Sequence, residues 1–286
     1  MSSVSCDLCQ GSDCAVETTF DGWRLVKCGN CGLKWLEPKP DSETCVRLYD
    51  QHYFNSHEAK LLGYSSYEDR FRSKIRTFNF YLRQIEAFHK PGTSLDVGCA
   101  FGYFIRAAQA RGWNAHGIDI STYAVEQAAK TRLPVKCGDF LQCRCEESYD
   151  LVTAWDLIEH MLSPHAFFSQ AWHMLKDGGI LGLTTPDSQS LVARLWGRRW
   201  YQYKLPEHIY YLNRATITAY CRELGFVILC CRKAVKFRSL PDALARGLGL
   251  YESKRLSHSF VGKVLVPYPS LCEIFLLAQK RNPQAH

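Results

Sequence analysis

The chain has 286 residues, of which 47% are hydrophobic and 22% are charged, and its formal net charge is +7. This composition is typical of a soluble globular protein with one large or two modest domains, and it excludes disorder, collagen and coiled coil. A chain of this length can fold without disulfides, so its 14 cysteines need another explanation. The first residues show no signal peptide, and no apolar run reaches the ~20 residues of a membrane helix. We therefore expect a cytoplasmic protein without a membrane span, whose cysteines are metal ligands or buried apolar residues.

The positive charge lies in the C-terminal third. Residues 194–286 contain 16 Lys and Arg against 5 Asp and Glu, a net charge of +11, whereas residues 1–193 have a net charge of −4. A field of this sign favours an anionic partner, such as a phosphorylated metabolite, a nucleotide-linked sugar, a lipid head group or RNA. The alternative is a solvated surface that only keeps the protein in solution.

Two Cys-x-x-Cys pairs open the chain. The four cysteines are Cys6, Cys9, Cys28 and Cys31. Two residues between the cysteines of a pair let both thiolates reach one tetrahedral ion, and the spacing is that of structural zinc sites. Between the pairs, Asp21-Gly22 predicts the turn of a β-hairpin. We therefore predict a zinc ribbon over residues 1–40, with four thiolate ligands and no open position for catalysis; a rubredoxin-like iron site and a redox dithiol are the alternatives.

Prolines at 38 and 40 end the predicted ribbon. Residues 41–74 are polar and aromatic without clear periodicity, and we expect short helices or a lid there, linking the two parts of the chain. From Ile75 to about His89, apolar residues recur every three or four positions, which predicts a helix with one apolar face. Pro91-Gly92 would end that helix.

Strand-like and helical segments alternate over the rest of the chain. The predicted strands are Ser94–Val97, Ala115–Ile120, Val135–Phe140, Asp150–Trp155, Gly179–Thr185, Phe226–Val235 and Glu273–Lys280. The predicted helices between them are Tyr103–Arg111, Thr122–Thr131, Pro164–Leu175 and Arg214–Leu224. Strands joined by helices require crossover connections. The pattern therefore predicts an α/β fold over residues 75–286, with a doubly wound, Rossmann-like, mainly parallel sheet and a basic C-terminal segment.

Three successive predicted strands end in residues that suit an adenosine. The first runs into a turn with Gly98 and Gly102, where a ligand can approach the main chain closely. Asp119, after the second strand, can accept hydrogen bonds from both ribose hydroxyls, and Asp139, after the third, can accept one from the adenine amino group. Alternatively, Asp119 caps a helix and Asp139 is a turn residue. The turn lacks the Gly-x-Gly-x-x-Gly of dinucleotide sites, and the nearby Asp96 would repel phosphate but attract a positively charged group.

These motifs, in this order, resemble those of class I S-adenosylmethionine-dependent methyltransferases. The resemblance covers about residues 75–235 and rests on Leu95–Gly102, Gly117–Asp119, Gly138–Phe140, Asp150–His160 and Leu175–Gly179. It implies a seven-stranded sheet whose last strand is antiparallel. The segments Trp155–His160, Thr185–Asp187 and Pro206–Ile209 are similar to ubiquinone-biosynthesis O-methyltransferases. Cysteine-pair ribbons ahead of such domains look like those of bacterial methyltransferases that act on sugars, polysaccharides and other secondary metabolites.

The resemblance implies S-adenosylmethionine as the cofactor and assigns residues to its parts. The implied residues are Asp96, Gly98, Cys99 and Gly102 for the methionine moiety, Asp119 and Ile120 for the ribose, Asp139 and Phe140 for the adenine, and Trp155 and Asp156 for the pocket floor. One departure from the family is Ala100, which stands where the Gly-x-Gly-x-Gly turn has its middle glycine. This small residue should narrow the turn without closing it.

Methyl transfer from a sulfonium is an in-line displacement, so the enzyme mainly supplies alignment and excludes water. A hydroxyl acceptor must also lose its proton, and histidine is the natural base near neutral pH. His160 follows the fourth predicted strand and His208 lies in a later loop, so either is a candidate catalytic base; the alternative for His160 is a buried histidine that fixes the start of a helix. Asp156, Glu159 and His160 also resemble a segment that accompanies a divalent metal in some related O-methyltransferases, which makes Mg²⁺ a candidate second ion.

We therefore predict a methyltransferase that acts on an oxygen of a small acceptor, anionic, carrier-linked or sugar-like. A sugar C-methyltransferase is the second hypothesis, and a nucleic-acid modifying or binding protein is the third. Against nucleic acid, the ribbon carries four basic and five acidic residues through residue 40. A binding scaffold that methylates nothing is the last alternative. The aromatic and basic segment Trp196–Tyr203 is a candidate acceptor lid, or else an amphipathic surface helix.

Overall fold

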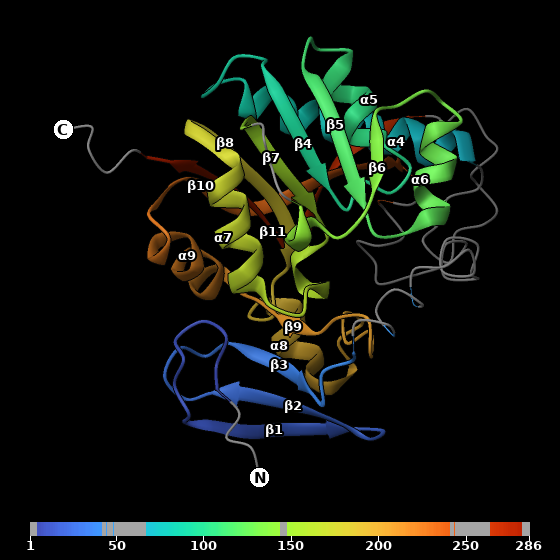
Figure 1. The fold of residues 1–286 in the computed structure, drawn as a ribbon. Coiled ribbons are helices and arrows are strands. Elements are labelled where there is room, and N and C mark those ends of the chain that lie inside the picture. The colour runs from blue at the N-terminus through green and yellow to red at the C-terminus, as the bar shows by residue number, and fades with distance from the viewer. Residues whose placement is uncertain are drawn as a thin grey trace.

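The computed structural model describes residues 5–41, 44, 48, 67–143, 148–240, 243 and 264–281. These ranges form two β-sheets, one of four strands and one of seven. Figure 1 shows the small sheet, which holds the N-terminal strands, below the large sheet, with β9 (Tyr210–Tyr211) and α8 (Leu191–Trp196) between them. Most of the predicted linker, residues 41–74, lies outside the described ranges.

The small sheet contains the predicted hairpin. β1 (Cys14–Phe20) and β2 (Trp23–Cys28) pair antiparallel around Asp21-Gly22, and Gly22 has a positive φ of 89° that this turn requires. β3 (Lys34–Glu37) pairs with β2, and β9 pairs with the other edge of β3. Because β9 comes from much later in the chain, the ribbon sheet is completed by a strand from the main part of the molecule.

The large sheet has the predicted doubly wound topology. Its strands are β4 (Thr93–Val97), β5 (Asn114–Asp119), β6 (Val135–Cys137), β7 (Tyr149–Trp155), β8 (Leu175–Pro186), β10 (Phe226–Ser239) and β11 (Leu265–Lys280). They lie in the order β10-β11-β8-β7-β4-β5-β6. The strands from β8 to β6 are parallel, and β11 is antiparallel to both neighbours, as the family resemblance implies. The chain reverses its direction of winding between β4 and β7, and ligands of such sheets bind at the carboxyl ends of the strands beside that point.

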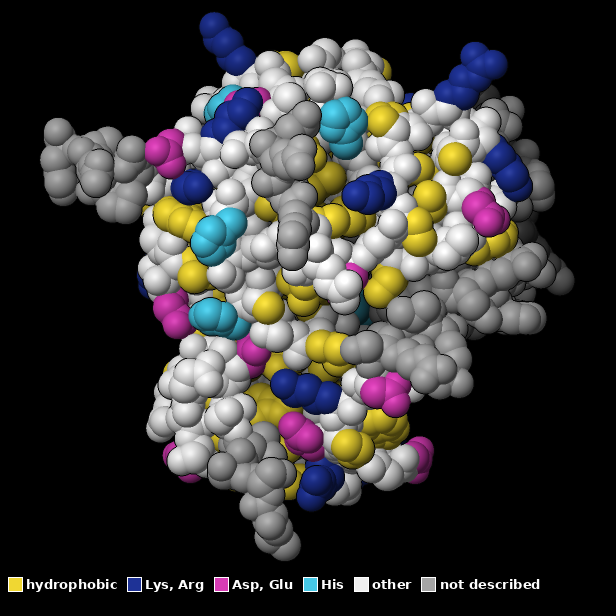
Figure 2. Space-filling view, viewed as in Figure 1, with side chains coloured by type: hydrophobic (Ala, Val, Ile, Leu, Met, Phe, Trp, Pro, Cys, Tyr) yellow, Lys and Arg dark blue, Asp and Glu magenta, His cyan; other side chains and the backbone are white. Residues whose placement is uncertain are grey.

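Helices cover both faces of the large sheet. α4 (Tyr67–Ile85) and α5 (Tyr103–Gln109) pack on one face, and α7 (Pro164–Met174) and α9 (Arg214–Glu223) on the other, while α6 (Thr122–Ala129) follows β5. Alternation along β7 supplies both cores, because Leu151 joins the first and Val152 the second. Figure 2 shows hydrophobic side chains gathered where the small and large sheets meet, and Lys and Arg side chains scattered over this face. Among the described helices, none combines the length and the hydropathy that crossing a bilayer requires.

Several elements differ in extent from the prediction. β6 ends at Cys137, and a 3-10 helix, η1 (Phe140–Gln142), begins where the strand was expected to continue. α4 begins at Tyr67, earlier than the expected start at Ile75. β10 and β11 extend past the edge of β8 as a two-stranded arm, and α4 stabilises this arm because Thr77 Oγ1 accepts a hydrogen bond of 2.8 Å from Phe237 N.

Candidate active site

The turn after β4 exposes main chain at the carboxyl edge of the sheet. Gly98, Ala100 and Gly102 have positive φ angles of 67°, 44° and 71°. Gly98 N donates to Ile118 O over 2.8 Å, which ties the turn to β5. A Cβ atom at Gly98 would lie 2.8 Å from Leu157 Cδ1, closer than such atoms pack, so this position requires glycine.

Asp119, at the end of β5, braces that turn. Its Oδ2 accepts from Ala100 N and its Oδ1 from Ser121 N, both over 2.8 Å, and burial raises its pKa. The bond to Ala100 explains how an alanine keeps a left-handed conformation that favours glycine. Each carboxylate oxygen retains a lone pair, so the bracing role leaves Asp119 able to accept hydrogen bonds from ribose hydroxyls.

Asp96 and Cys99 lie under the turn and are both buried. Asp96 Oδ1 accepts a hydrogen bond of 2.7 Å from Thr153 Oγ1 on β7. Burial raises the pKa of Asp96 to about 8, and burial also raises the pKa of the Cys99 thiol. A cation placed beside Asp96 would favour its ionised form, whereas Cys99 stays a neutral apolar side chain.

The third strand end has a different construction from that expected. Asp139 Oδ1 accepts from Leu141 N over 2.9 Å and thereby starts η1, the turn role that the sequence left open for this residue. The Phe140 ring is buried and lies 5.3 Å from the ring of Phe167. Ile120, which follows β5, is 38% exposed. Among Ile120, Asp139 and Phe140, Ile120 therefore presents the most accessible side chain to a ligand.

Trp155, at the end of β7, lies in an aromatic stack. Its ring centroid is 5.1 Å from that of Tyr81 on α4 and 6.3 Å from that of Phe275 on β11, with interplanar angles of 23° and 2°. Within the described residues, Trp155 Nε1 and Tyr81 Oη are buried without a hydrogen-bond partner. This stack forms a rigid apolar layer directly before Asp156.

Asp156 belongs to an ion triad that the sequence analysis missed. Its Oδ2 lies 3.0 Å from Lys236 Nζ, which lies 2.7 Å from Glu273 Oε2, and its Oδ1 accepts from Thr184 Oγ1 over 2.8 Å. Burial opposes charge on Asp156, but Lys236, Lys74 and the hydrogen bond from Thr184 together outweigh it and lower the pKa of Asp156. Likewise, burial disfavours the Lys236 charge, but the two carboxylates raise its pKa. A signal was present in the sequence, because Lys236 directly follows one predicted strand and Glu273 begins the next.

The structure brings His160 and His208 together. Their ring centroids are 4.7 Å apart with the rings nearly perpendicular at 85°, although the residues come from different loops. His160 Nδ1 is 2.9 Å from Glu207 O, so it donates there and Nε2 is left as the proton acceptor. Burial lowers the pKa of His160 to about 4, and burial together with His160 lowers the pKa of His208. Both rings are therefore neutral at pH 7, and each can accept a proton or bind a metal.

Glu159 completes a candidate second metal site. Its carboxylate is buried and accepts a hydrogen bond of 2.9 Å from Thr185 Oγ1, and burial together with the charge of Asp156 raises its pKa to about 8. Ligand atoms of Glu159, His160 and His208 all lie within 4.8 Å of one another, and the buried His208 Nδ1 has no hydrogen-bond partner among the described residues. Asp156 is held by Lys236 and does not join them. Two imidazoles and one carboxylate suit a transition-metal ion better than Mg²⁺, which prefers oxygen ligands.

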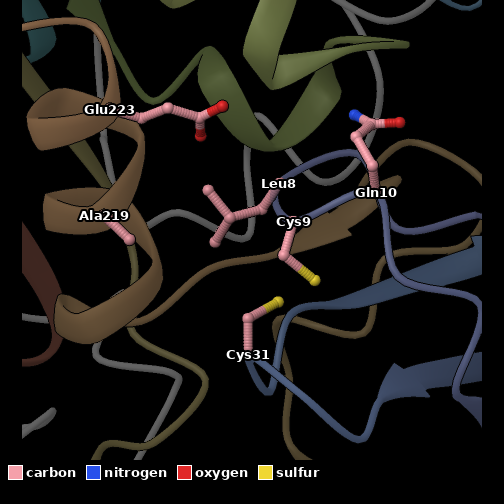
Figure 3. Close-up of a pocket in the computed structure, with 6 residues that line it drawn as sticks. All are labelled: Leu8, Cys9, Gln10, Cys31, Ala219 and Glu223. Carbon is pink, nitrogen blue, oxygen red and sulfur yellow. The ribbon is translucent and has the colours of Figure 1, made fainter.

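The four N-terminal cysteines form a cluster of the predicted kind. Their Sγ atoms lie within 4.8 Å of one another, with 3.4 Å between Cys6 and Cys31 and 3.5 Å between Cys9 and Cys28. Against the effect of burial, hydrogen bonds from the main-chain N–H of Cys31 and the Sγ of Cys9 lower the pKa of Cys28 to about 7. Burial raises the pKa of Cys6, and it raises that of Cys31 to about 11. Four converging thiols fit a tetrahedral zinc ion. Figure 3 shows Cys9 and Cys31 pointing toward each other beside a pocket that Leu8, Gln10, Ala219 and Glu223 also line.

The candidate acceptor lid packs against the ribbon. Trp200 is 2% exposed and lies in one apolar cluster with Leu25 and Leu36 of the small sheet. Tyr203 contacts Phe20, with ring centroids 5.0 Å apart. These aromatic side chains therefore attach the ribbon to the main part of the molecule.

The fold and the site match a known family. A family model described as a methyltransferase domain matches residues 67–230, which is more than half of the chain. The chain belongs to the methyltransferase-domain family. The matched range contains the turn after β4 and His160, and it ends within β10, before Lys236.

Curated relatives of this methyltransferase-domain protein are ubiquinone biosynthesis O-methyltransferases. The one from Leptothrix cholodnii is 24% identical over 146 residues, covering 46% of this chain and 62% of its own length. The one from Paraburkholderia phytofirmans is 29% identical over 114 residues, covering 36% of this chain and 49% of its own length. The chain thus spans from about half to less than two thirds of the length of these relatives.

A solved structure supports the fold. The magnesium protoporphyrin IX methyltransferase from Synechocystis PCC 6803, solved with bound SAH, is 17% identical, with a TM-score of 0.57. The match covers 84% of this chain and all of that chain. At this identity the comparison shows that the two chains share a fold.

Proposed function

We propose that the protein transfers the methyl group of S-adenosylmethionine to a hydroxyl oxygen of a small acceptor. The main support is the position of His160 at the carboxyl edge of β7, where its ring lies 4.7 Å from that of His208, beside the strand ends that suit the donor. The turn after β4, Asp96 and Asp119 would hold the donor, because they combine open main chain with acceptors for an ammonium and for ribose hydroxyls. The names of the curated relatives point to the same reaction class.

Two chemical routes remain for activating the acceptor. In the first, His160 or His208 takes the hydroxyl proton directly, as neutral imidazoles can. In the second, Glu159, His160 and His208 hold a transition-metal ion, which when bound would lower the pKa of the acceptor hydroxyl. Both routes place the acceptor oxygen beside the histidine pair and the sulfonium above the turn after β4.

The charges near the site favour an acceptor that carries negative charge. Lys204 is close enough to lower the pKa of both histidines, although burial is the larger cause of each shift. Burial acts to raise the pKa of Asp156, but Lys74, on α4, acts together with Lys236 to lower it. Two lysines at the acceptor side suit a carboxylate or phosphate on a sugar or carrier-linked acceptor.

A screen with isotope-labelled methyl donor tests this proposal. Purified protein is incubated with labelled S-adenosylmethionine and pools of hydroxylated sugar, phenol and nucleotide-linked acceptors, and products are analysed by mass spectrometry. A labelled methyl ether supports O-methylation. A label on carbon would favour the C-methyltransferase alternative, and a label on RNA or DNA the nucleic-acid alternative; the absence of any transfer, with cofactor bound, would favour a binding scaffold.

A further inference from the structure

The second cysteine pair connects to the histidine pair through β3, which follows it after a short turn. Leu36 N donates to Ile209 O over 2.9 Å, and Ile209 N donates to Glu159 O over 2.8 Å. His208 directly precedes Ile209, and His160 directly follows Glu159. The main chain of β3 therefore supports both segments that carry the candidate acceptor-activating side chains.

The first cysteine pair reaches the same region through Asp7, which stands between its two cysteines. Asp7 Oδ1 accepts from Ser163 Oγ over 2.7 Å, and Oδ2 accepts from His165 N over 2.9 Å and from Tyr220 Oη over 2.8 Å. Ser163 caps α7, and η2 (Ile158–His160) ends shortly before it. Asp7 thus fixes the chain on the other side of the Glu159–His160 segment.

A metal ion bound by the four cysteines would add to the order of the first cysteine pair. Residues 6–13 contain neither a strand nor a helix. Metal binding to thiolates supplies folding free energy that so short a segment lacks. Without the ion, we expect the Asp7 carboxylate to lose its fixed position and β3 to lose the turn that precedes it.

We propose that metal binding by the four cysteines positions Glu159, His160 and His208 for acceptor activation, with Asp7 as a positioning residue. This inference rests on the proposed function. It adds that the geometry of Glu159, His160 and His208, the acceptor half of the site, depends on the ribbon. The cofactor half of the site consists of the turn after β4, Asp96 and Asp119. Asp119 accepts hydrogen bonds from that turn and from Ser121, and Asp96 accepts one from β7, so these bonds involve no ribbon residue. Loss of the metal should therefore change the positions of the two histidines and lower acceptor turnover, and it should leave the affinity for the cofactor unchanged.

Asp7→Ala tests the coupling, with Asp21→Ala at the hairpin turn as a matched control in the same ribbon. For Asp7→Ala we expect one bound metal per chain, a Kd for S-adenosylmethionine within about twofold of the wild type, and kcat/KM for the acceptor about tenfold lower. In spectra of ¹⁵N-histidine-labelled protein, the ring nitrogens of His160 and His208 should shift. Asp7→Asn, whose amide oxygen still accepts from His165 N, should be intermediate, and Asp21→Ala should resemble the wild type.

Two results would overturn the proposal. One is an Asp7→Ala protein whose histidine spectrum and acceptor turnover match the wild type. The other is an equal loss of cofactor affinity and acceptor turnover, which would mean that the ribbon only stabilises the whole fold. Should Asp7→Ala fail to fold, chelation of metal from the wild-type protein provides the same comparison of cofactor Kd and histidine spectrum. Neither readout uses an acceptor, so a failure of the proposed function remains distinguishable.

Discussion

The cofactor and acceptor halves of the site are built from contacts of different range. In the cofactor half, Asp119 bonds to Ser121, two residues away, and to Ala100 on the preceding turn. In the acceptor half, His160 contacts the carbonyl of Glu207, and Asp156 pairs with Lys236 on β10. The first half is a property of one strand–turn–strand unit, whereas the second is assembled from segments far apart in the chain.

This difference shows where specificity can change within the fold. A cofactor half made of neighbouring elements is preserved whenever those elements form, so it can remain constant while acceptors vary. The acceptor half depends on loops, on the C-terminal strands and on the ribbon sheet. Substitutions in the two halves should therefore separate cofactor affinity from turnover and stability.

The largest effect should come from Lys236→Met in the acceptor half. Removing the ammonium leaves Asp156 and Glu273 facing each other, which should cost about 3 kcal/mol of unfolding free energy at pH 7. Because the pKa of Asp156 is lowered in the folded protein, its stabilisation is present above its ordinary pKa of about 4 and is lost as the pH falls through the folded value. The difference between wild type and variant in the free energy of unfolding by urea should therefore become smaller in acid.

Lys233→Met, at an exposed position of the same strand, is the control. A difference that stays constant down to low pH would contradict the ion triad.

The second-largest effect should come from the histidine pair, and it separates turnover, in the acceptor half, from affinity for the donor, in the cofactor half. His160→Ala should lower kcat by about 100-fold if this imidazole takes the acceptor proton, while the Kd for S-adenosylmethionine stays within about twofold. His208→Ala should have a smaller effect under the direct route and a similar one under the metal route, which needs both rings. Rapid-quench measurement of methyl transfer distinguishes the two, and full activity in both variants would leave alignment alone as the source of catalysis.

In the cofactor half, Asp119→Ala should weaken binding of S-adenosylmethionine by about 30-fold. The variant loses the hydrogen bond from Ala100 N, and in the proposed site it would also lose charge-assisted hydrogen bonds to ribose. Asp139→Ala, whose carboxylate starts η1, should weaken binding by about threefold or less. Calorimetric titration of both variants checks this ranking, and equal losses would remove the special role assigned to Asp119.

The smallest effect concerns pH. Burial raises the pKa of Asp96 to about 8 in the free protein, and a cationic ligand favours its ionised form. Affinity for S-adenosylmethionine should therefore gain from rising pH until about 8, and Asp96→Asn should lack this gain. The ratio of wild-type to variant association constants should increase several-fold between about pH 6 and pH 8, and this ratio cancels the titration of the ligand itself. A pH-independent ratio would show that Asp96 does not face the cation.

Much of the fold was predictable because it depends on local patterns. The Asp21-Gly22 hairpin and the alternation of strands and helices are confirmed, and so is the antiparallel last strand, which the family resemblance implied. The end of β6 was wrong, because the Asp139 side chain caps η1 at a position where apolar periodicity favoured a strand. The pairing of β9 with β3 was not predicted, since two residues carry too little pattern to identify a strand.

By itself, the sequence determined the cysteine pairs, the succession of strands and helices along the chain and the chemical types at the ends of the predicted strands. These features follow from spacing and periodicity, which each segment carries whatever surrounds it. Only the tertiary structure decided that His160 lies against His208, that Asp156 is neutralised by Lys236, and that the ribbon shares a sheet with the segment after His208. Such contacts arise from burial and from charge pairing between distant segments, and no local pattern records which distant residue will supply the partner.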